Sequence, residues 1–134
     1  MNADGAIIKR ISTERVPVPK GHYSQAIQYD GLVYVSGQLP LRPDGTHKAS
    51  AGFEEQAQTA LDNLFAILRA ANSDPQRLLK VTVYIVGIEN WPRFDAIYAA
   101  ALGEARPARS VVPVKELHYG CLIEIDAIAA SNSG

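Results

Sequence analysis

Apolar residues recur at helical spacing in two segments of the chain. In residues 53–71 they lie three or four positions apart, at Phe53, Ala57, Leu61, Leu64, Leu68 and Ala71. This spacing places apolar side chains on one face of a helix. A second stripe is formed by Trp91, Phe94, Tyr98, Ala101 and Leu102. Asn90 is a suitable cap and Pro92 is tolerated in a first turn, so a second helix is predicted from residue 91.

Extended segments rich in β-branched and aromatic residues surround these helices. Residues 25–29 and 32–36 flank Asp30-Gly31, and an Asp-Gly pair between two such runs is a strong hairpin signal. Further strands are predicted over residues 6–11, 79–86, 109–114 and 122–129. Residues 39–52 contain Pro, Gly and polar side chains and are expected to form a loop.

The order of these elements predicts an α+β fold in which two helices cover one face of a sheet. Several strands are nevertheless apolar on both faces. Over residues 79–86, Leu79, Val81, Val83 and Ile85 oppose Lys80, Thr82, Tyr84 and Val86. The sequence therefore predicts a homo-oligomer that buries the second face. The alternative is a semi-polar face left open to water, which antiparallel sheets permit.

Composition narrows the function classes. The 134 residues suit one domain over 1–134, and a net charge of −1 disfavours a protein that coats nucleic acid or anionic membrane. The mean hydropathy is −0.05, and no apolar run is long enough for a membrane span. Residues 1–5 lack the features of a signal peptide, so a cytoplasmic location is expected. The single cysteine, Cys121, excludes an internal disulfide.

Familiar cofactor and nucleophile motifs are missing. The three histidines, His22, His47 and His118, are not spaced at i+3 or i+4, and His118 with Cys121 has no second pair to complete a zinc site. There is no G-x-S-x-G, P-loop or G-x-G-x-x-G sequence, although a Ser-His-Asp triad stays open. No metal and no cofactor are expected.

Polar residues near strand ends remain as candidates. Arg109 follows Pro107 at the start of a strand and is suited to bind a carboxylate through two hydrogen bonds. Glu124 and Asp126 share one face of the last strand, where a carboxylate is unfavourable unless it is paired or functional. The alternative for Glu124 is a structural ion pair, with Arg109 as one possible partner.

A further group consists of G-H-Y-S-Q at residues 21–25 and S-G-Q at residues 36–38. Gly37 allows backbone N–H groups to approach a ligand, and the Tyr23 phenol can be both an apolar wall and a donor. Ser36 ends the predicted strand. Taken singly, each of these residues is also explained by ordinary turn chemistry.

Together these segments resemble the RidA family, also called YjgF/YER057c/UK114. The resemblance extends in order over residues 17–129 and is carried by G-H-Y-S-Q-A, V-Y-V-S-G-Q, E-Q-A-Q-T-A-L-D-N-L, K-V-T-V-Y, R-P-A-R-S and I-E-I-D-A-I-A. It implies a chorismate-mutase-like fold with a six-stranded, mostly antiparallel sheet and two helices on one face. It also implies a homotrimer with active sites between subunits.

The activity implied by the resemblance is that of a 2-iminobutanoate/2-iminopropanoate deaminase. Such a hydrolase converts reactive 2-enamines or 2-imines, such as 2-aminoacrylate, to 2-oxo acids and ammonia. Arg109 matches the residue that binds the substrate carboxylate, and Glu124 the acid that positions or activates water. Tyr23 and Ser36 match pocket residues, and Gly37 matches a backbone N–H contact.

The sequence departs from the family pattern at two positions. Val111 stands where a cysteine is common, so only its backbone N–H is expected to contribute. Asp95 stands where an asparagine is common and, if it faces the pocket, would disfavour dianionic substrates. Two other functions are considered: a regulatory trimer that binds a 2-oxo acid without turnover, and an RNA-cleaving translation inhibitor. The charge balance and the absence of an evident His pair disfavour the latter.

Overall fold

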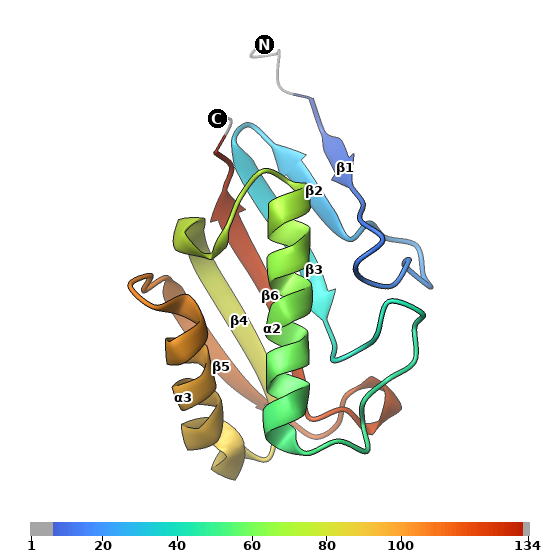
Figure 1. Ribbon diagram of the computed structural model, residues 1–134, viewed down its shortest axis with the longest axis vertical. Coiled ribbons are helices and arrows are strands. Elements are labelled where there is room, and N and C mark those ends of the chain that lie inside the picture. The colour runs from blue at the N-terminus through green and yellow to red at the C-terminus, as the bar shows by residue number, and fades with distance from the viewer. Residues whose placement is uncertain (1–6, 133–134) are drawn as a thin grey trace.

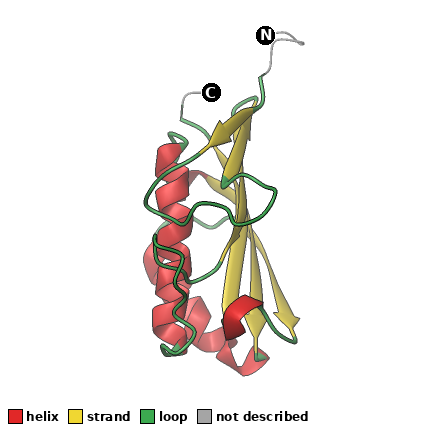
Figure 2. Cartoon of the chain, turned by 90° about the vertical axis from the view of Figure 1, so that its right-hand side faces the viewer, coloured by secondary structure: helices red, strands yellow, loops and turns green. Residues whose placement is uncertain are grey.

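The computed structural model describes residues 7–132, which form one six-stranded sheet with both long helices on the same face (Figure 1, Figure 2). The strands are β1 (Lys9–Ile11), β2 (Ala26–Tyr29), β3 (Leu32–Gln38), β4 (Leu78–Val86), β5 (Ala108–Val114) and β6 (Ile123–Ala130). The helices are α2 (Phe53–Ala70) and α3 (Trp91–Leu102), with short 3₁₀ helices η1 (Pro75–Arg77), η2 (Ile88–Asn90) and η3 (His118–Gly120). The predicted α+β architecture is confirmed. Residues 1–6, including the start of the first predicted strand and the region expected to lack a signal peptide, lie outside the described residues.

The strands are arranged in the order β1-β2-β3-β6-β4-β5. Every neighbouring pair is antiparallel except β4 and β5, which are parallel and joined through α3. A parallel pair requires such a crossover connection. The last strand, β6, therefore lies in the interior of the sheet between β3 and β4, and this position brings Glu124 away from the sheet edges.

The predicted hairpin is present between β2 and β3. Asp30 and Gly31 both have positive φ, at 51° and 84°, as a two-residue turn of this type requires. The turn sets a register in which Ala26 is opposite Val35 and Tyr29 is opposite Leu32. This local signal fixes which residues of β3 face the helices.

The hydrophobic core lies between the sheet and the two helices (Figure 2). Helix α2 buries the apolar stripe seen in the sequence, and α3 buries Phe94, Tyr98 and Leu102. The strands contribute every second residue, including Val33, Val81, Val83, Ile85, Ile123 and Ile125. Among the described residues, no helix is long and apolar enough to cross a membrane.

Two local expectations were wrong. Leu79 was expected on the same face as Val81, Val83 and Ile85, which the structure buries, but it is 47% exposed. A register shift between Leu78 and Lys80 gives Leu78 the buried place on that face. Asn90 precedes α3 but makes no capping hydrogen bond. Its Nδ2 instead donates to the carbonyl of Val86 at 3.0 Å, because η2 leads directly into the helix.

The second face of the sheet carries mixed polar and apolar side chains. Lys80, Thr82, Tyr84, Glu124 and Asp126 alternate there with the buried positions of β4 and β6. Both helices lie on the opposite side of the sheet (Figure 2). We call this second face the open face. Its contacts include Tyr84 Oη donating to Asp126 Oδ2 at 3.2 Å.

Candidate active site

A cavity of about 620 Å³ lies where the ends of β3 and β6 meet the segment before β2. Its wall includes Tyr23, Ser36, Gly37, Gln38, His118 and Glu124. We call this cavity the Glu124 pocket. It unites four of the site residues expected from the sequence, from segments up to about one hundred residues apart in the chain.

Backbone anchoring positions the Tyr23 and Ser36 side of the pocket. The buried Gln25 side chain donates to the carbonyls of Thr13 and Pro17 at 3.1 and 3.0 Å. The Ser36 hydroxyl donates to the carbonyl of Ser24 at 2.6 Å, so its proton is already engaged. Tyr23 is 57% exposed at the edge of the cavity. Tyr23 is therefore free to contact a ligand, whereas Ser36 offers mainly its oxygen lone pairs.

Gly37 allows the Glu124 carboxyl group to lie directly against the backbone of β3. A Cβ atom on residue 37 would approach the Glu124 Cδ to 3.0 Å, closer than real Cβ atoms normally come to a neighbour. The pairing of β3 with β6 shifts register between Val35 and Gln38, at this same point. The glycine and the register shift together make room for the carboxylate.

Glu124 carries an uncompensated charge. Burial raises the pKa of Glu124 above its usual value, Asp126 adds to the effect, and the charge of His118 opposes it. Among residues 7–132, Glu124 forms no ion pair and no side-chain hydrogen bond. The suggested ion pair between Glu124 and Arg109 is therefore wrong.

Arg109 lies in a different group of residues, between α3 and the start of β5. Its Nη1 donates to Asp95 Oδ1 at 3.1 Å. Its guanidinium carbon lies 4.4 Å from the ring centroid of Trp91 and 4.9 Å from that of Tyr98. Such contacts are cation–π interactions. We call these four residues the Arg109 cluster.

The hydroxyl of Tyr98 has an unusual environment in this cluster. Tyr98 is only 7% exposed, and among the described residues its Oη has no hydrogen-bond partner. Burial raises the pKa of the Tyr98 phenol, while the neighbouring Arg109 lowers it. Tyr98 thus supports Arg109 through its ring and not through its hydroxyl.

The sheet register places the two groups apart. Arg109 is paired with Val81, which pairs with Ala127, on the helix-covered face. Glu124 is paired with Tyr84, which pairs with Val112, on the open face. Three residues along the strands and two strand spacings separate their Cα atoms by roughly 14 Å. Within one chain the two expected catalytic residues therefore do not meet.

Val111 lies on the same face as Arg109. It is paired with Val83 and packs against the hydrophobic core. Asp95 also lies with Arg109, through the ion pair. The seven expected site residues are thus divided, with Tyr23, Ser36, Gly37 and Glu124 in the pocket and Asp95, Arg109 and Val111 elsewhere.

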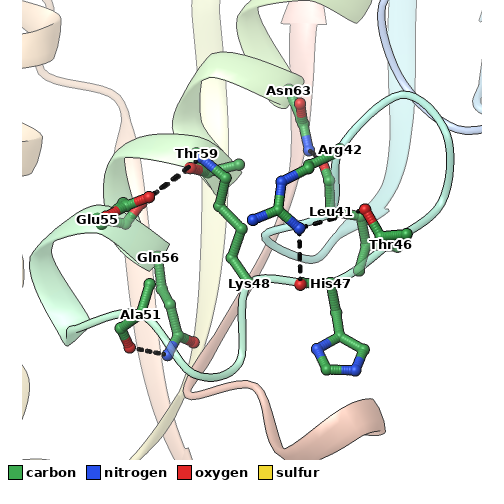
Figure 3. Close-up of polar contacts among 10 residues, drawn as sticks. All are labelled: Leu41, Arg42, Thr46, His47, Lys48, Ala51, Glu55, Gln56, Thr59 and Asn63. Carbon is green, nitrogen blue, oxygen red and sulfur yellow. Dashed lines mark hydrogen bonds and ion pairs between the residues drawn. The ribbon is translucent and has the colours of Figure 1, made fainter.

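The loop over residues 39–52 forms another wall of the pocket and is fastened to α2 (Figure 3). Asn63 Nδ2 donates to the carbonyls of Leu39 and Leu41 at 3.1 and 2.9 Å. The fully buried Gln56 donates to the carbonyl of Ala51 at 2.9 Å and accepts from the Leu122 N–H at 2.8 Å. Sequence reasoning missed these residues, although a polar residue on the apolar side of a predicted helix is a usable signal.

The fold also assembles an aromatic group that the sequence spacing did not indicate. The rings of His47 and Tyr119 stack with centroids 5.4 Å apart, and His118 lies 6.0 Å from the same tyrosine. His118 and Tyr119 line the Glu124 pocket. His118 is thus a titratable neighbour of Glu124 that was not among the predicted site residues. It comes from the short 3₁₀ helix η3, where the sequence carries no periodic signal.

The residues that could bind a metal or act as a nucleophile are dispersed. In the described part of the chain, no group of three or more His, Cys, Asp and Glu side chains is placed to hold a metal ion. Cys121 is fully buried, and burial raises the pKa of its thiol. The available chemistry is therefore that of a carboxylate, a guanidinium and neighbouring hydroxyl and imidazole groups.

Comparisons with known proteins agree on one family. A family model described as Endoribonuclease L-PSP matches residues 13–131. The chain is 38% identical to mouse 2-iminobutanoate/2-iminopropanoate deaminase, covering 92% of this chain and 91% of the mouse protein. It is also 38% identical to the RutC family protein UK114 of Drosophila melanogaster, covering 93% and 91%. The crystal structure of the yjgF gene product from E. coli superposes with a TM-score of 0.85 at 36% identity, covering 91% and 98%.

Proposed function

The chain belongs to the RidA family, the family of the Endoribonuclease L-PSP model, and on this premise we propose that it hydrolyses 2-imino acids to 2-oxo acids and ammonia. The observation that supports this most is the state of Glu124. It is a partly buried, unpaired carboxylate with a raised pKa that lines a cavity. A carboxyl group with a raised pKa that lines a cavity is a candidate general base or acid.

The chemistry requires one base that later acts as an acid. Water attacks the electrophilic C2 of the imine while Glu124 accepts a proton from it, and the C=N electron pair moves to nitrogen. That proton passes to nitrogen and gives the carbinolamine, C(OH)NH2. Glu124 then accepts the hydroxyl proton and delivers it to the amino nitrogen, so that the C–N bond breaks and ammonia leaves as the carbonyl forms. Arg109 holds the substrate carboxylate, which fixes the angle of attack. Each step uses groups that this chain provides.

Because the two groups are on opposite faces of one sheet, we infer that a complete site combines the Glu124 pocket of one copy with the Arg109 cluster of another. Neither long helix covers the open face (Figure 2), which exposes Tyr34 and Val112 at 41% and 37%. A closed homotrimer, as implied by the resemblance, would bring Arg109 of one copy to the Glu124 pocket of another and would cover the open face. The small-molecule ligand would then bind between subunits.

The activity can be tested with a pyridoxal-phosphate-dependent dehydratase that releases 2-aminoacrylate from serine. The wild-type protein is expected to accelerate pyruvate release above the spontaneous rate in buffer. Arg109→Ala is expected to lose roughly a hundredfold or more of the added rate, because the substrate is no longer oriented. Arg69→Ala, which removes an exposed arginine from the end of α2, is the matched control. Binding of 2-oxobutyrate without turnover by the wild type would replace this proposal with a regulatory role.

The shared site can be tested by mixing two inactive variants. Arg109→Ala and Glu124→Gln chains are coexpressed with different tags, and assemblies that carry both tags are purified. In a mixed trimer, roughly one site in three combines an intact Arg109 with an intact Glu124 from different copies. About a third of the wild-type activity should return. No recovery in doubly tagged assemblies would mean that the site does not lie between copies.

One second candidate has an observation in its favour. The family description names an endoribonuclease, and the fold brings His47 and His118 to the same tyrosine. Histidine pairs can provide general acid and base for RNA cleavage. This candidate requires RNA cleavage that falls steeply with salt and is lost in both His47→Gln and His118→Gln. Cleavage that survives both substitutions would indicate a contaminating nuclease.

A further inference from the structure

Asp95 is placed so that it shares the guanidinium that the proposed function assigns to the substrate carboxylate. Trp91, Asp95 and Tyr98 lie at i, i+4 and i+7 on α3 and therefore on one face of that helix. All three contact Arg109. The helix thus presents two aromatic rings and a carboxylate to a single arginine.

The Asp95 contact uses only some of the hydrogen-bond donors of Arg109. A guanidinium has five N–H donors, and Asp95 accepts from Nη1. The side chains of Arg109 and Asp95 are 25% and 53% exposed. A pair with this exposure contributes little to stability, so it does not close the site to another carboxylate. Asp95 therefore changes the charge that a ligand meets without removing Arg109 from use.

The charge balance around the ligand then limits what can bind. Arg109 and Asp95 together have no net charge, and the Glu124 pocket, on the other side of the proposed shared site, contributes the Glu124 carboxylate when ionised and the Lys20 ammonium in its wall. One substrate carboxylate still gains directional hydrogen bonds from the arginine. A second carboxylate on the same ligand finds no unpaired positive charge in the Arg109 cluster and is repelled by Asp95.

We propose that Asp95 is a specificity-determining residue that makes the Arg109 site selective for monoanionic 2-imino and 2-oxo acids over dianionic ones. This inference rests on the proposed function, because it takes Arg109 as the carboxylate-binding group. The substrates are therefore imino acids with uncharged side chains. Acidic imino acids are disfavoured by the repulsion between their second carboxylate and Asp95.

The substitution Asp95→Asn isolates the charge. An asparagine oxygen can still accept from Arg109, so the orientation of the guanidinium is retained while the negative charge is removed. Asp62→Asn is the control, because Asp62 is exposed on α2, away from the Arg109 cluster, and its carboxylate accepts a hydrogen bond from the neutral Gln58 Nε2 at 2.9 Å. Both variants change the net charge equally, and neither position is buried.

The experiment measures Kd for 2-oxobutyrate and 2-oxoglutarate by calorimetry, with wild type and both variants, at low ionic strength and in 0.5 M sodium chloride. These acids are the stable monoanionic and dianionic probes. Asp95→Asn is expected to shift the ratio of the two Kd values by roughly three- to tenfold in favour of the dianion. The shift should shrink in high salt, whereas Asp62→Asn should leave the ratio unchanged.

Turnover separates failure of this inference from failure of the proposed function. If the wild type hydrolyses imines but Asp95→Asn leaves the ratio of Kd values unchanged, the assigned role of Asp95 is wrong and the deaminase proposal stands. The same conclusion follows if Asp62→Asn shifts the ratio equally. If none of the three proteins binds either acid or accelerates imine hydrolysis, the proposed function and the inference both fail.

Discussion

Arg109 and Glu124 are the central charged side chains of the Arg109 cluster and the Glu124 pocket, and their surroundings differ. Arg109 has a carboxylate partner from its own chain and two aromatic rings against its faces. Among the described residues, Glu124 has no ion-pair partner, and burial raises its pKa. The guanidinium is thus stabilised before any ligand arrives, whereas the carboxylate is held in a setting that disfavours its charge.

This difference separates a binding group from a reacting group. A residue that only orients a substrate benefits from rigid support, because any loss of alignment reduces the rate. A residue that accepts and returns a proton benefits from a pKa close to the working pH, and burial shifts the pKa of a carboxylic acid upward in that direction. The following substitutions change either the surroundings of Glu124 or those of Arg109.

Glu124→Gln should have the largest effect, because it removes the proton acceptor. We expect kcat to fall by roughly 10²–10⁴-fold with little change in KM, since Arg109 still binds the carboxylate. Arg109→Ala should instead raise KM as well as lower kcat. Steady-state kinetics of the coupled dehydratase reaction distinguish the two. Equal effects of both substitutions on KM would show that the two residues do not divide binding from chemistry.

The same substitution has a consequence for stability whose sign is set by the raised pKa. The folded protein binds the Glu124 proton more readily than the unfolded chain, so this group favours folding below its usual pKa and opposes folding above the raised pKa. At neutral pH, Glu124→Gln should therefore unfold at a higher urea concentration than the wild type. The advantage should vanish as the pH falls through this window.

Gly37→Ala should have the next largest effect, because the new Cβ displaces the Glu124 carboxyl group. We expect roughly a ten- to hundredfold loss of kcat/KM, since misplacement of a reacting group is enough to reduce the rate by this amount. Stability should change little, because the displaced atoms end a flexible side chain. Gly52→Ala is the control, as its Cβ would meet only Glu54 Oε1 at 4.0 Å. Full activity in Gly37→Ala would mean that Glu124 works from another position.

Local signals in the sequence predicted the elements, and departures arose where tertiary structure overrode them. The Asp30-Gly31 turn and the stripe of α2 depend on near neighbours, and both were predicted with correct bounds to within two residues. The position of Leu79 was predicted wrongly because an alternating pattern does not reveal a register shift. The predicted cap at Asn90 is absent because its side chain instead donates to a carbonyl of β4.

The candidate site shows a different limit of sequence reasoning. Spacing and resemblance selected the residues, but they did not indicate that Arg109 and Glu124 face opposite sides of the sheet. That result depends on the parallel pairing of β5 with β4 and on the antiparallel pairing of β4 with β6. Trp91 was predicted on the apolar stripe of α3 and does pack against the core, but the helical period did not indicate its contact with Arg109.

His118→Gln should have a smaller effect, confined to acidic pH. The charge of His118 lowers the pKa of Glu124, so its removal should raise that pKa further. The acid limb of the kcat/KM profile should move to higher pH, with the rate unchanged well above it. His22→Gln is the control, because His22 does not line the Glu124 pocket. A lower rate across the whole pH range would instead indicate that His118 takes part in the chemistry.

Tyr98→Phe should have the smallest effect and a sign opposite to that of most substitutions. The Tyr98 hydroxyl is buried without a partner among the described residues, and such a group lowers stability by about 1–3 kcal/mol. Phenylalanine keeps the ring against Arg109 and removes the hydroxyl, so unfolding should become less favourable by up to about 1–3 kcal/mol, with activity within about twofold. Tyr84→Phe is the contrast, because that hydroxyl donates to Asp126 at 3.2 Å, and its loss should reduce stability. If Tyr98→Phe were destabilising by more than about 1 kcal/mol, the hydroxyl would have to bind a second copy of the chain, and the Arg109 cluster would be as incomplete alone as the Glu124 pocket.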